Sequence, residues 1–168
     1  MCSPGCDLTK RRKDAKGQAV GPVTSWAEFA AEAPELAAFG LERFKQGVAF
    51  LGTVRPDGWP RVHPVTPIVG EGRLFLFMEP TSPKGQDLRR DGRYAMHTLV
   101  TDQVGSGGEF VVRGRATPVD DPAVRAGAAG AASYSPAERY VLFELGVEGA
   151  LATVYEGGRP VRRRWGAP

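Results

Sequence analysis

Short β-prone runs separated by tight-turn residues fill residues 48–78, and this pattern constrains the fold more than any other feature of the chain. Residues 48–54 end at Arg55-Pro56-Asp57-Gly58, where proline presets φ and glycine tolerates positive φ, so a hairpin is predicted. The return strand is predicted at residues 61–69, and a turn at residues 70–72 leads into residues 73–78. That last run is apolar on both faces, so we expect it at the centre of a sheet.

Four further strands are predicted, at residues 94–101, 109–119, 147–155 and 159–165. The last two form a C-terminal hairpin around Gly157-Gly158. About seven strands joined mainly by hairpins favour an antiparallel sheet, and closure into a small barrel would remove its exposed edges. The expected fold class is therefore mainly β with flanking helices.

Helix-start signals predict where those helices lie. Ser25 and Glu28 have the spacing of a capping box, which predicts a helix from Trp26. Four further helical segments are expected: from Pro34 to near Gly47, residues 84–91, the alanine-rich segment after Asp121-Pro122, and the segment around residues 140–143 that follows a second capping box at residues 135–138.

The excess of basic charge lies in the first 20 residues. They hold five of the 22 Lys and Arg and two of the 19 Asp and Glu, so residues 21–168 carry 17 side chains of each sign. Residues 1–23 are expected to be a disordered basic leader, because they have few large apolar groups. Residues 24–168 are expected to form one domain, whose balanced charge argues against a nucleic-acid partner.

Cys2 and Cys6 are the only cysteines, and both lie in this leader. No histidine lies near them to complete a zinc site, so neither a metal site nor a functional disulfide is expected. No apolar run approaches the roughly 20 residues that span a bilayer, and the N-terminus lacks the apolar segment of a signal peptide. We therefore expect a cytoplasmic protein without membrane contact.

The loop Ser82-Pro83-Lys84-Gly85 stands at the start of a predicted helix. Free backbone N–H groups, the helix dipole and the Lys84 ammonium would all favour one anion there, so a phosphate seat is predicted. The alternative is an ordinary solvated lysine in a first helical turn.

The predicted strand at residues 61–69 could bring further side chains to that seat. Arg61 and His63 share a face by the period of two. Pro64 and Pro67 cannot donate ladder hydrogen bonds, so this strand should be an edge, a bulge or an opening for a ligand. A structural role for His63 remains an alternative.

Two other features favour structural interpretations. His97 lies on a β-prone run and is expected to be a structural histidine. The run Gly105-Ser106-Gly107-Gly108 lacks the strand-to-helix context of a phosphate-binding loop, so a hairpin tip is expected.

Three sequence runs occur in a characteristic order along the chain. They are Asp57-Gly58-Trp59-Pro60 with the proline-containing strand after it, Leu74-Phe75-Leu76-Phe77, and residues 82–91. Together they resemble the pyridoxamine 5′-phosphate oxidase-like superfamily of flavin-binding split β-barrels. The resemblance covers residues 36–165, and the hairpin with the Ser82-x-Lys84 loop is its most specific part.

The resemblance implies a homodimer that binds FMN, or in a related branch the deazaflavin F420, in grooves at the subunit interface. Ser82 and Lys84 would hold the phosphate. The strand from Arg61 through His63 would pass beneath the flavin ring, with backbone groups of Val65 and Thr66 near the polar edge of the ring. The bound flavin would then supply the chemistry, and no side-chain acid or nucleophile is required.

Departures from the oxidases narrow this expectation. The resemblance places arginine in authentic pyridoxamine phosphate oxidases where this chain has His63 and Pro83, and lysine where it has Ile68. Oxidation of vitamin B6 is therefore not expected. We expect an FMN- or F420-dependent oxidoreductase that moves a hydride to or from a small organic substrate.

Three alternatives remain open. Trp165 and the arginines at residues 162–164 could reach across the dimer to the cofactor, or they could form an edge strand whose charge blocks aggregation. The chain could be a flavin- or haem-binding module without turnover, with His63 as an axial ligand. The basic leader could bind nucleic acid, which we expect least.

Overall fold

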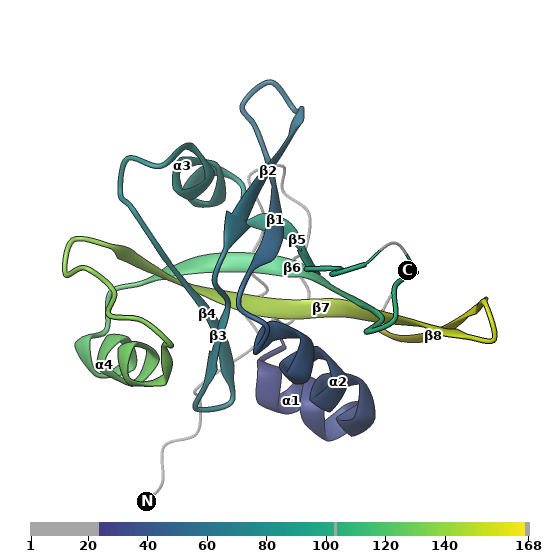
Figure 1. Cartoon of the computed structure of the whole chain (residues 1–168). Helices are drawn as coiled ribbons and strands as arrows, with labels where there is room; N and C mark the ends of the chain where they lie inside the picture. Colours follow the sequence, from purple (N-terminus) through teal and green to yellow (C-terminus); the bar gives the residue numbers. More distant parts are fainter. Residues whose placement is uncertain (1–23, 103, 167–168) are drawn as a thin grey trace, which may run out of the picture.

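The computed structural model describes residues 24–102 and 104–166, so the expected leader, Cys2 and Cys6 lie outside the described residues. The described residues form one eight-stranded antiparallel sheet with four helices (Figure 1). The elements in chain order are α1 (Trp26–Glu32), α2 (Pro34–Phe44), β1 (Ala49–Val54), β2 (Pro60–Val65), β3 (Ile68–Gly70), β4 (Arg73–Met78), α3 (Pro83–Arg90), β5 (Arg93–Thr98), β6 (Glu109–Val119), α4 (Pro122–Ala131), β7 (Val141–Glu156) and β8 (Arg159–Gly166).

The sheet curls because β2 and β3, which follow one another in the chain, lie at its two ends. The strand order is β2-β1-β5-β6-β7-β4-β3, and β8 pairs with β7 off this path. Only Thr66 and Pro67 separate β2 from β3 in the chain, although these strands end the order on opposite sides. The long strand β7 pairs with β4 through residues 141–144 and with β8 through residues 149–156. The resulting sheet is rolled up and splits where β7 changes partner.

Two helices cover the main core, and their starts follow from local capping. The backbone N–H of Ser25 donates to Glu28 Oε2 over 2.7 Å, and the Glu28 N–H donates to Ser25 Oγ over 3.2 Å, so the predicted capping box is present. Trp26 and Phe29 lie on the buried face of α1, and their rings pack edge to face at 5.3 Å between ring centroids. Among the described residues, no helix has both the length and the apolar character that a membrane crossing requires.

The predicted strand at residues 61–69 is two strands rather than one. β2 pairs with β1 along its whole length, and only β3 pairs with β4. The chain breaks at Thr66 and Pro67 because it passes there from one end of the sheet to the other, and Pro67 has no N–H for a ladder. Of the three alternatives expected for this proline-containing strand, an edge, a bulge or an opening, the structure shows an edge, because β2 ends the strand order.

The helix predicted around residues 140–143 is wrong, because β7 begins at Val141. The Tyr140 N–H donates to the Ala137 carbonyl over 3.0 Å, so the second capping-box pattern forms a turn. Phe143 lies opposite Leu76 of β4, and both are fully buried. Burial of β-prone side chains between β4 and β6 therefore overrides the local helix signal.

The other predicted elements are confirmed with small shifts in their ends. β4 and β6 occupy the predicted residues 73–78 and 109–119, and β4 is buried on both faces. The alanine-rich segment forms α4, whose start is capped by Asp121 through its side chain. α4 covers a smaller second core that contains Ile68, Phe75 and Leu142.

Candidate functional site

The N-terminus of α3 is built as the sequence predicts. Ser82 is the N-cap, and its Oγ accepts a hydrogen bond of 3.3 Å from the Gly85 backbone N–H. Pro83 occupies the first turn, where a missing N–H costs nothing. Within the described ranges, no hydrogen bond or ion pair engages the Lys84 ammonium. This cation is therefore available to a ligand.

The strand β2 presents alternate faces to α3 and to solvent. Arg61, His63 and Val65 are partly or fully buried, whereas Val62 and Pro64 between them are exposed. Arg61 and His63 thus share a face, as predicted. The charges of both Lys84 and Arg61 lower the pKa of His63, so both cations act on the same imidazole.

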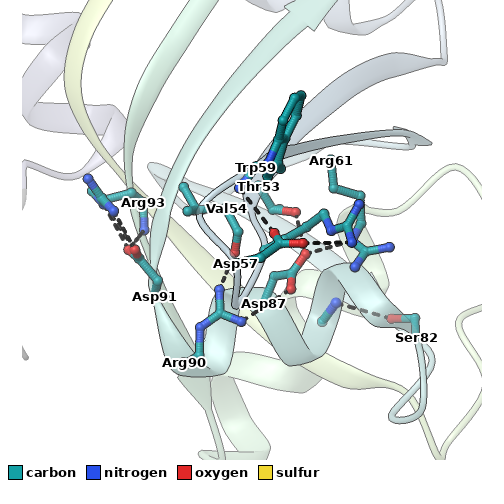
Figure 2. Close-up of polar contacts among 12 residues, drawn as sticks. Thr53, Val54, Asp57, Trp59, Arg61, Ser82, Asp87, Arg90, Asp91 and Arg93 are labelled. Carbon is teal, nitrogen blue, oxygen red and sulfur yellow. Dashed lines mark hydrogen bonds and ion pairs between the residues drawn. The ribbon is translucent and has the colours of Figure 1, made fainter.

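A buried carboxylate on α3 organises this region, as Figure 2 shows. Asp87 Oδ2 accepts hydrogen bonds from Thr53 Oγ1 of β1 over 2.9 Å and from Arg61 Nε of β2 over 2.7 Å. Its second oxygen lies 3.5 Å from Arg90 Nη1, and the other end of the Arg90 guanidinium donates to the Val54 carbonyl. Asp87 therefore ties α3 to both strands of the first hairpin.

These contacts set the charge state of Asp87 and of His63. Burial alone would raise the pKa of Asp87, but the hydrogen bonds from Arg61 and Thr53 hold it below its usual value. The pKa of His63 is lowered by its burial and then by the charges of Lys84 and Arg61, against a smaller opposing effect of Asp87. These shifts favour the anionic form of Asp87 and the neutral imidazole of His63.

Val65 and Thr66 lie where the predicted site leaves the sheet. Val65 is the last residue of β2, is buried, and pairs with Ala49 of β1. Thr66 follows it outside the ladders of both β2 and β3. The backbone polar groups of Thr66 are therefore free of strand pairing, and those of Val65 lie at the end of an edge strand, where both can meet a ligand.

Trp165 is engaged elsewhere in its own chain. Its indole Nε1–H donates to Glu32 Oε2 over 2.9 Å, and its ring lies 4.9 Å from that of Phe29. Both partners belong to α1, which lies well apart from α3 in Figure 1. Within one chain, the structure does not bring Trp165 to Lys84.

Asp87 is the functional candidate that sequence reasoning missed, and Thr53 and Arg90 are its structural partners. Asp87 follows Lys84 by three residues and precedes Arg90 by three, so all three share one side of α3. One sequence signal could have found Asp87. It is a carboxylate next to the buried Leu88 on a short helix, with a cation three residues before it and another three residues after it.

The two features interpreted as structural lie in structural surroundings. His97 Nδ1 is 2.6 Å from the Thr98 carbonyl oxygen, which fixes the ring on β5. Gly105 and Gly108 belong to the connection between β5 and β6, where the Gly108 N–H donates to the Gly105 carbonyl over 2.8 Å.

The outward face of the first hairpin is apolar and exposed. Val62 of β2 is 63% exposed and Phe50 of β1 is 40% exposed, and Phe50 pairs with Pro64 across the ladder. Trp59, at the end of the turn, is 71% exposed. A monomer rarely leaves such a contiguous apolar surface uncovered.

Comparison of the sequence with family models gives one match. The model described as pyridoxamine 5′-phosphate oxidase matches residues 33–153, which include β1 to β6, α3 and most of β7. A search of the curated proteins finds none that matches.

Solved structures match the fold at low sequence identity. PhzG from Burkholderia lata 383, in complex with tetrahydrophenazine-1-carboxylic acid, is 17% identical over 88% of each chain, with a TM-score of 0.58. A NimC/NimA family protein from Clostridium acetobutylicum is 19% identical over 78% of this chain and 93% of its own, with a TM-score of 0.58. A heme binding protein from Mycobacterium smegmatis is 20% identical over 70% of this chain and 52% of its own, with a TM-score of 0.56, so the chain spans about half of that protein. These matches confirm the predicted split barrel, mainly β with flanking helices.

Proposed function

This chain belongs to the pyridoxamine 5′-phosphate oxidase family, and from that premise we propose that it is an FMN- or F420-dependent oxidoreductase acting on a small organic substrate. The observation that carries the proposal is the Lys84 ammonium at the N-terminus of α3, which has no partner among the described residues and acts, with Arg61, on the pKa of His63 of β2. Each of these groups suits a phosphorylated, planar cofactor.

The phosphate of such a cofactor fits the start of α3. The Ser82 oxygen accepts from Gly85, which leaves its hydroxyl hydrogen free to donate. Lys84 adds a cation that has no partner in the part of the chain that the structure describes, and hydrogen bonds to charged groups are stronger than neutral ones. Two donors and the helix dipole then act on one anion.

The face of β2 fits both the phosphate, through Arg61, and the rest of the cofactor, through His63. The neutral imidazole of His63 can donate one hydrogen bond from its ring. Arg61 uses Nε for Asp87 and keeps its two Nη groups for a ligand. Backbone groups of Val65 and Thr66, at the break between β2 and β3, would meet the polar edge of the ring. The bound flavin would supply hydride transfer, and these residues would bind and orient it.

Oxidation of pyridoxamine phosphate itself remains unsupported. The position where the oxidases have lysine is Ile68, which is 3% exposed and packs in the second core with Phe75. His63 and Pro83 likewise replace arginines. The substrate is therefore expected to be a different small molecule.

We also propose that the protein is a homodimer. The exposed apolar face formed by Phe50, Val62 and Pro64 is the surface on which a second copy would pack. In that dimer Trp165, which is remote from α3 of its own chain, would contact the cofactor bound mainly by the other copy.

Haem is the second candidate ligand, without turnover by the protein. A neutral imidazole is the form that ligates iron, and the pKa of His63 is lowered. One solved structure with this fold is a heme binding protein. In this alternative His63 is the axial ligand.

Titration of the purified protein with FMN, F420 and haemin separates these proposals. We expect FMN or F420 to bind saturably at one site per chain, with a change in its visible absorbance and fluorescence. A haemin complex whose Soret band is lost in His63→Ala, with neither FMN nor F420 bound, would replace the flavin proposal by the haem alternative.

A further inference from the structure

Two pairs of side chains face each other across the boundary between α3 and β2. Lys84 and Asp87 are one helical turn apart on α3, and Arg61 and His63 are two residues apart on β2, so each pair lies on one face of its element. Asp87 accepts a hydrogen bond of 2.7 Å from Arg61 Nε, so the two faces are opposed, and the charges of Lys84, Arg61 and Asp87 all act on the pKa of His63. The buried Asp87 carboxylate thus stands at the boundary between α3 and β2, next to the anion seat formed by Ser82, Lys84 and Arg61.

The contact between Arg61 and Asp87 fixes this arrangement (Figure 2). The Asp87 side chain is 3% exposed and the Arg61 side chain is 27% exposed, so the carboxylate is enclosed while the guanidinium reaches the surface. Moving Arg61 away would leave a buried charge without its main partner, which is strongly unfavourable. Arg61 is therefore held at Nε whether or not a ligand is present.

We propose that Asp87 is a positioning residue of the anion seat: it holds Arg61 by Nε, so that the two Nη groups bind the cofactor phosphate beside Lys84. This inference rests on the proposed function and extends it to a residue that touches no ligand. The geometry also predicts how Asp87 acts, namely only through Arg61.

Thr53 provides a matched control for the stability of α3. Its hydroxyl donates to the same carboxylate oxygen as Arg61 Nε, over 2.9 Å against 2.7 Å. Thr53→Val removes one tie between α3 and β1 but leaves the Arg61–Asp87 pair in place. A loss of affinity caused by loosening of α3 would appear in this variant, whereas a loss caused by misplacing Arg61 would not.

The experiment measures FMN affinity in the wild type, Asp87→Asn, Arg61→Gln, the double variant and Thr53→Val, each checked for folding by urea unfolding. Asp87→Asn keeps the size of the side chain and removes its charge. We expect each single change at the pair to weaken FMN binding by about tenfold, because a charged hydrogen bond is lost or misaligned. The double variant should bind no more weakly than Arg61→Gln alone, and Thr53→Val should bind within about twofold of the wild type.

Other outcomes would overturn the inference. Losses that add in the double variant, or an equal loss in Thr53→Val, would mean that Asp87 supports α3 in general. Unchanged or tighter binding in Asp87→Asn would mean that the carboxylate does not position a ligand group.

A failure of the proposed function is distinguishable from a failure of this inference. If the wild type binds F420 instead of FMN, the same variants are measured with F420. If the wild type binds neither cofactor, the flavin proposal fails, and the variants are titrated with inorganic phosphate while the His63 ring proton signals are followed. If Asp87→Asn and Arg61→Gln weaken phosphate binding and the double variant loses no more than Arg61→Gln alone, the role of Asp87 is supported although the flavin proposal has failed. Absence of phosphate binding would overturn it as well.

Discussion

His63 reports on the electrostatics of the candidate site, because three charged side chains act on it. Burial lowers its pKa from the ordinary 6.5, the cations Lys84 and Arg61 lower it further, and Asp87 opposes them. The unfolded chain therefore binds this proton more readily than the folded protein. As the pH falls through 6.5, proton uptake by the unfolded chain costs stability, and above that pH the cost is absent.

We predict that proton NMR will give His63 a pKa below 6.5, and that Lys84→Ala will raise it towards 6.5 because one nearby cation is gone. The chain has only two histidines, so His97→Gln assigns the signals. The same titration in Arg89→Ala, which removes an exposed cation from the same helix, is the control. A wild-type pKa at or above 6.5, or no change in Lys84→Ala, would contradict the geometry of the site.

At the residue scale, local signals predicted the ligand-facing side chains but not the residue that connects them. Ser82 and Lys84 are recognisable by their place at a helix start, and Arg61 and His63 by the period of a strand. Asp87 pairs with Arg61 across 26 positions of sequence. Such a pairing depends on how α3 docks against the first hairpin, and no local pattern encodes that docking.

At the element scale, the strands with strong alternation or strong turns were predictable, and the elements decided by packing were not. The prolines indicated an edge, a bulge or an opening, yet only the assembled sheet shows that β2 pairs with β1 and β3 with β4. The sequence pattern of a capping box at residues 135–138 caps no helix, because Val141 to Phe143 gain more by burial in β7 than they would in a helix.

The pairing of β6 with β7 depends on a glycine, which gives a test of the barrel. The register of these strands shifts between Arg113 and Gly114, and a Cβ atom on Gly114 would collide with the Gly146 carbonyl oxygen. We predict that Gly114→Ala destabilises the protein by at least about 1–3 kcal/mol, as overpacking does. The measurement is the urea midpoint at an unchanged dependence on denaturant.

Gly130→Ala is the matched control for that substitution. Gly130 lies in α4, and a Cβ atom added there would have no neighbouring atom within 4 Å. Alanine should stabilise a helix by up to about 1 kcal/mol relative to glycine. A Gly114→Ala protein as stable as the wild type would show that β6 and β7 do not pair closely at this register shift.

At the scale of the whole molecule, the exposed face of the first hairpin sets the expected assembly. Val62 and Phe50 share the outward face of β1 and β2, while α3 and the core take the inward face. A stable interface commonly buries about 800 Å² on each partner, and an uncovered apolar sheet face is a natural centre for it. The proposed dimer thus uses the surface that the barrel leaves open.

Val62→Glu should convert the proposed dimer into a monomer, because a carboxylate would be buried without a partner at the centre of the interface. Light scattering coupled to size exclusion measures the change. Val104→Glu, at a loop position that is 73% exposed, should leave the dimer intact. A wild-type monomer, or a Val62→Glu dimer, would show that this face is not the interface.

The most direct test of the proposed cofactor site is a titration with FMN that compares the wild type with Lys84→Ala and Arg89→Ala. Both variants remove one cation from α3, but only Lys84 lies at the helix start beside Ser82. We predict saturable binding by the wild type and by Arg89→Ala, and binding weakened by about 1.5–3 kcal/mol in Lys84→Ala, as for the loss of a hydrogen bond to a charged group. Equal affinity in all three proteins would contradict the assignment of the cofactor phosphate to the start of α3.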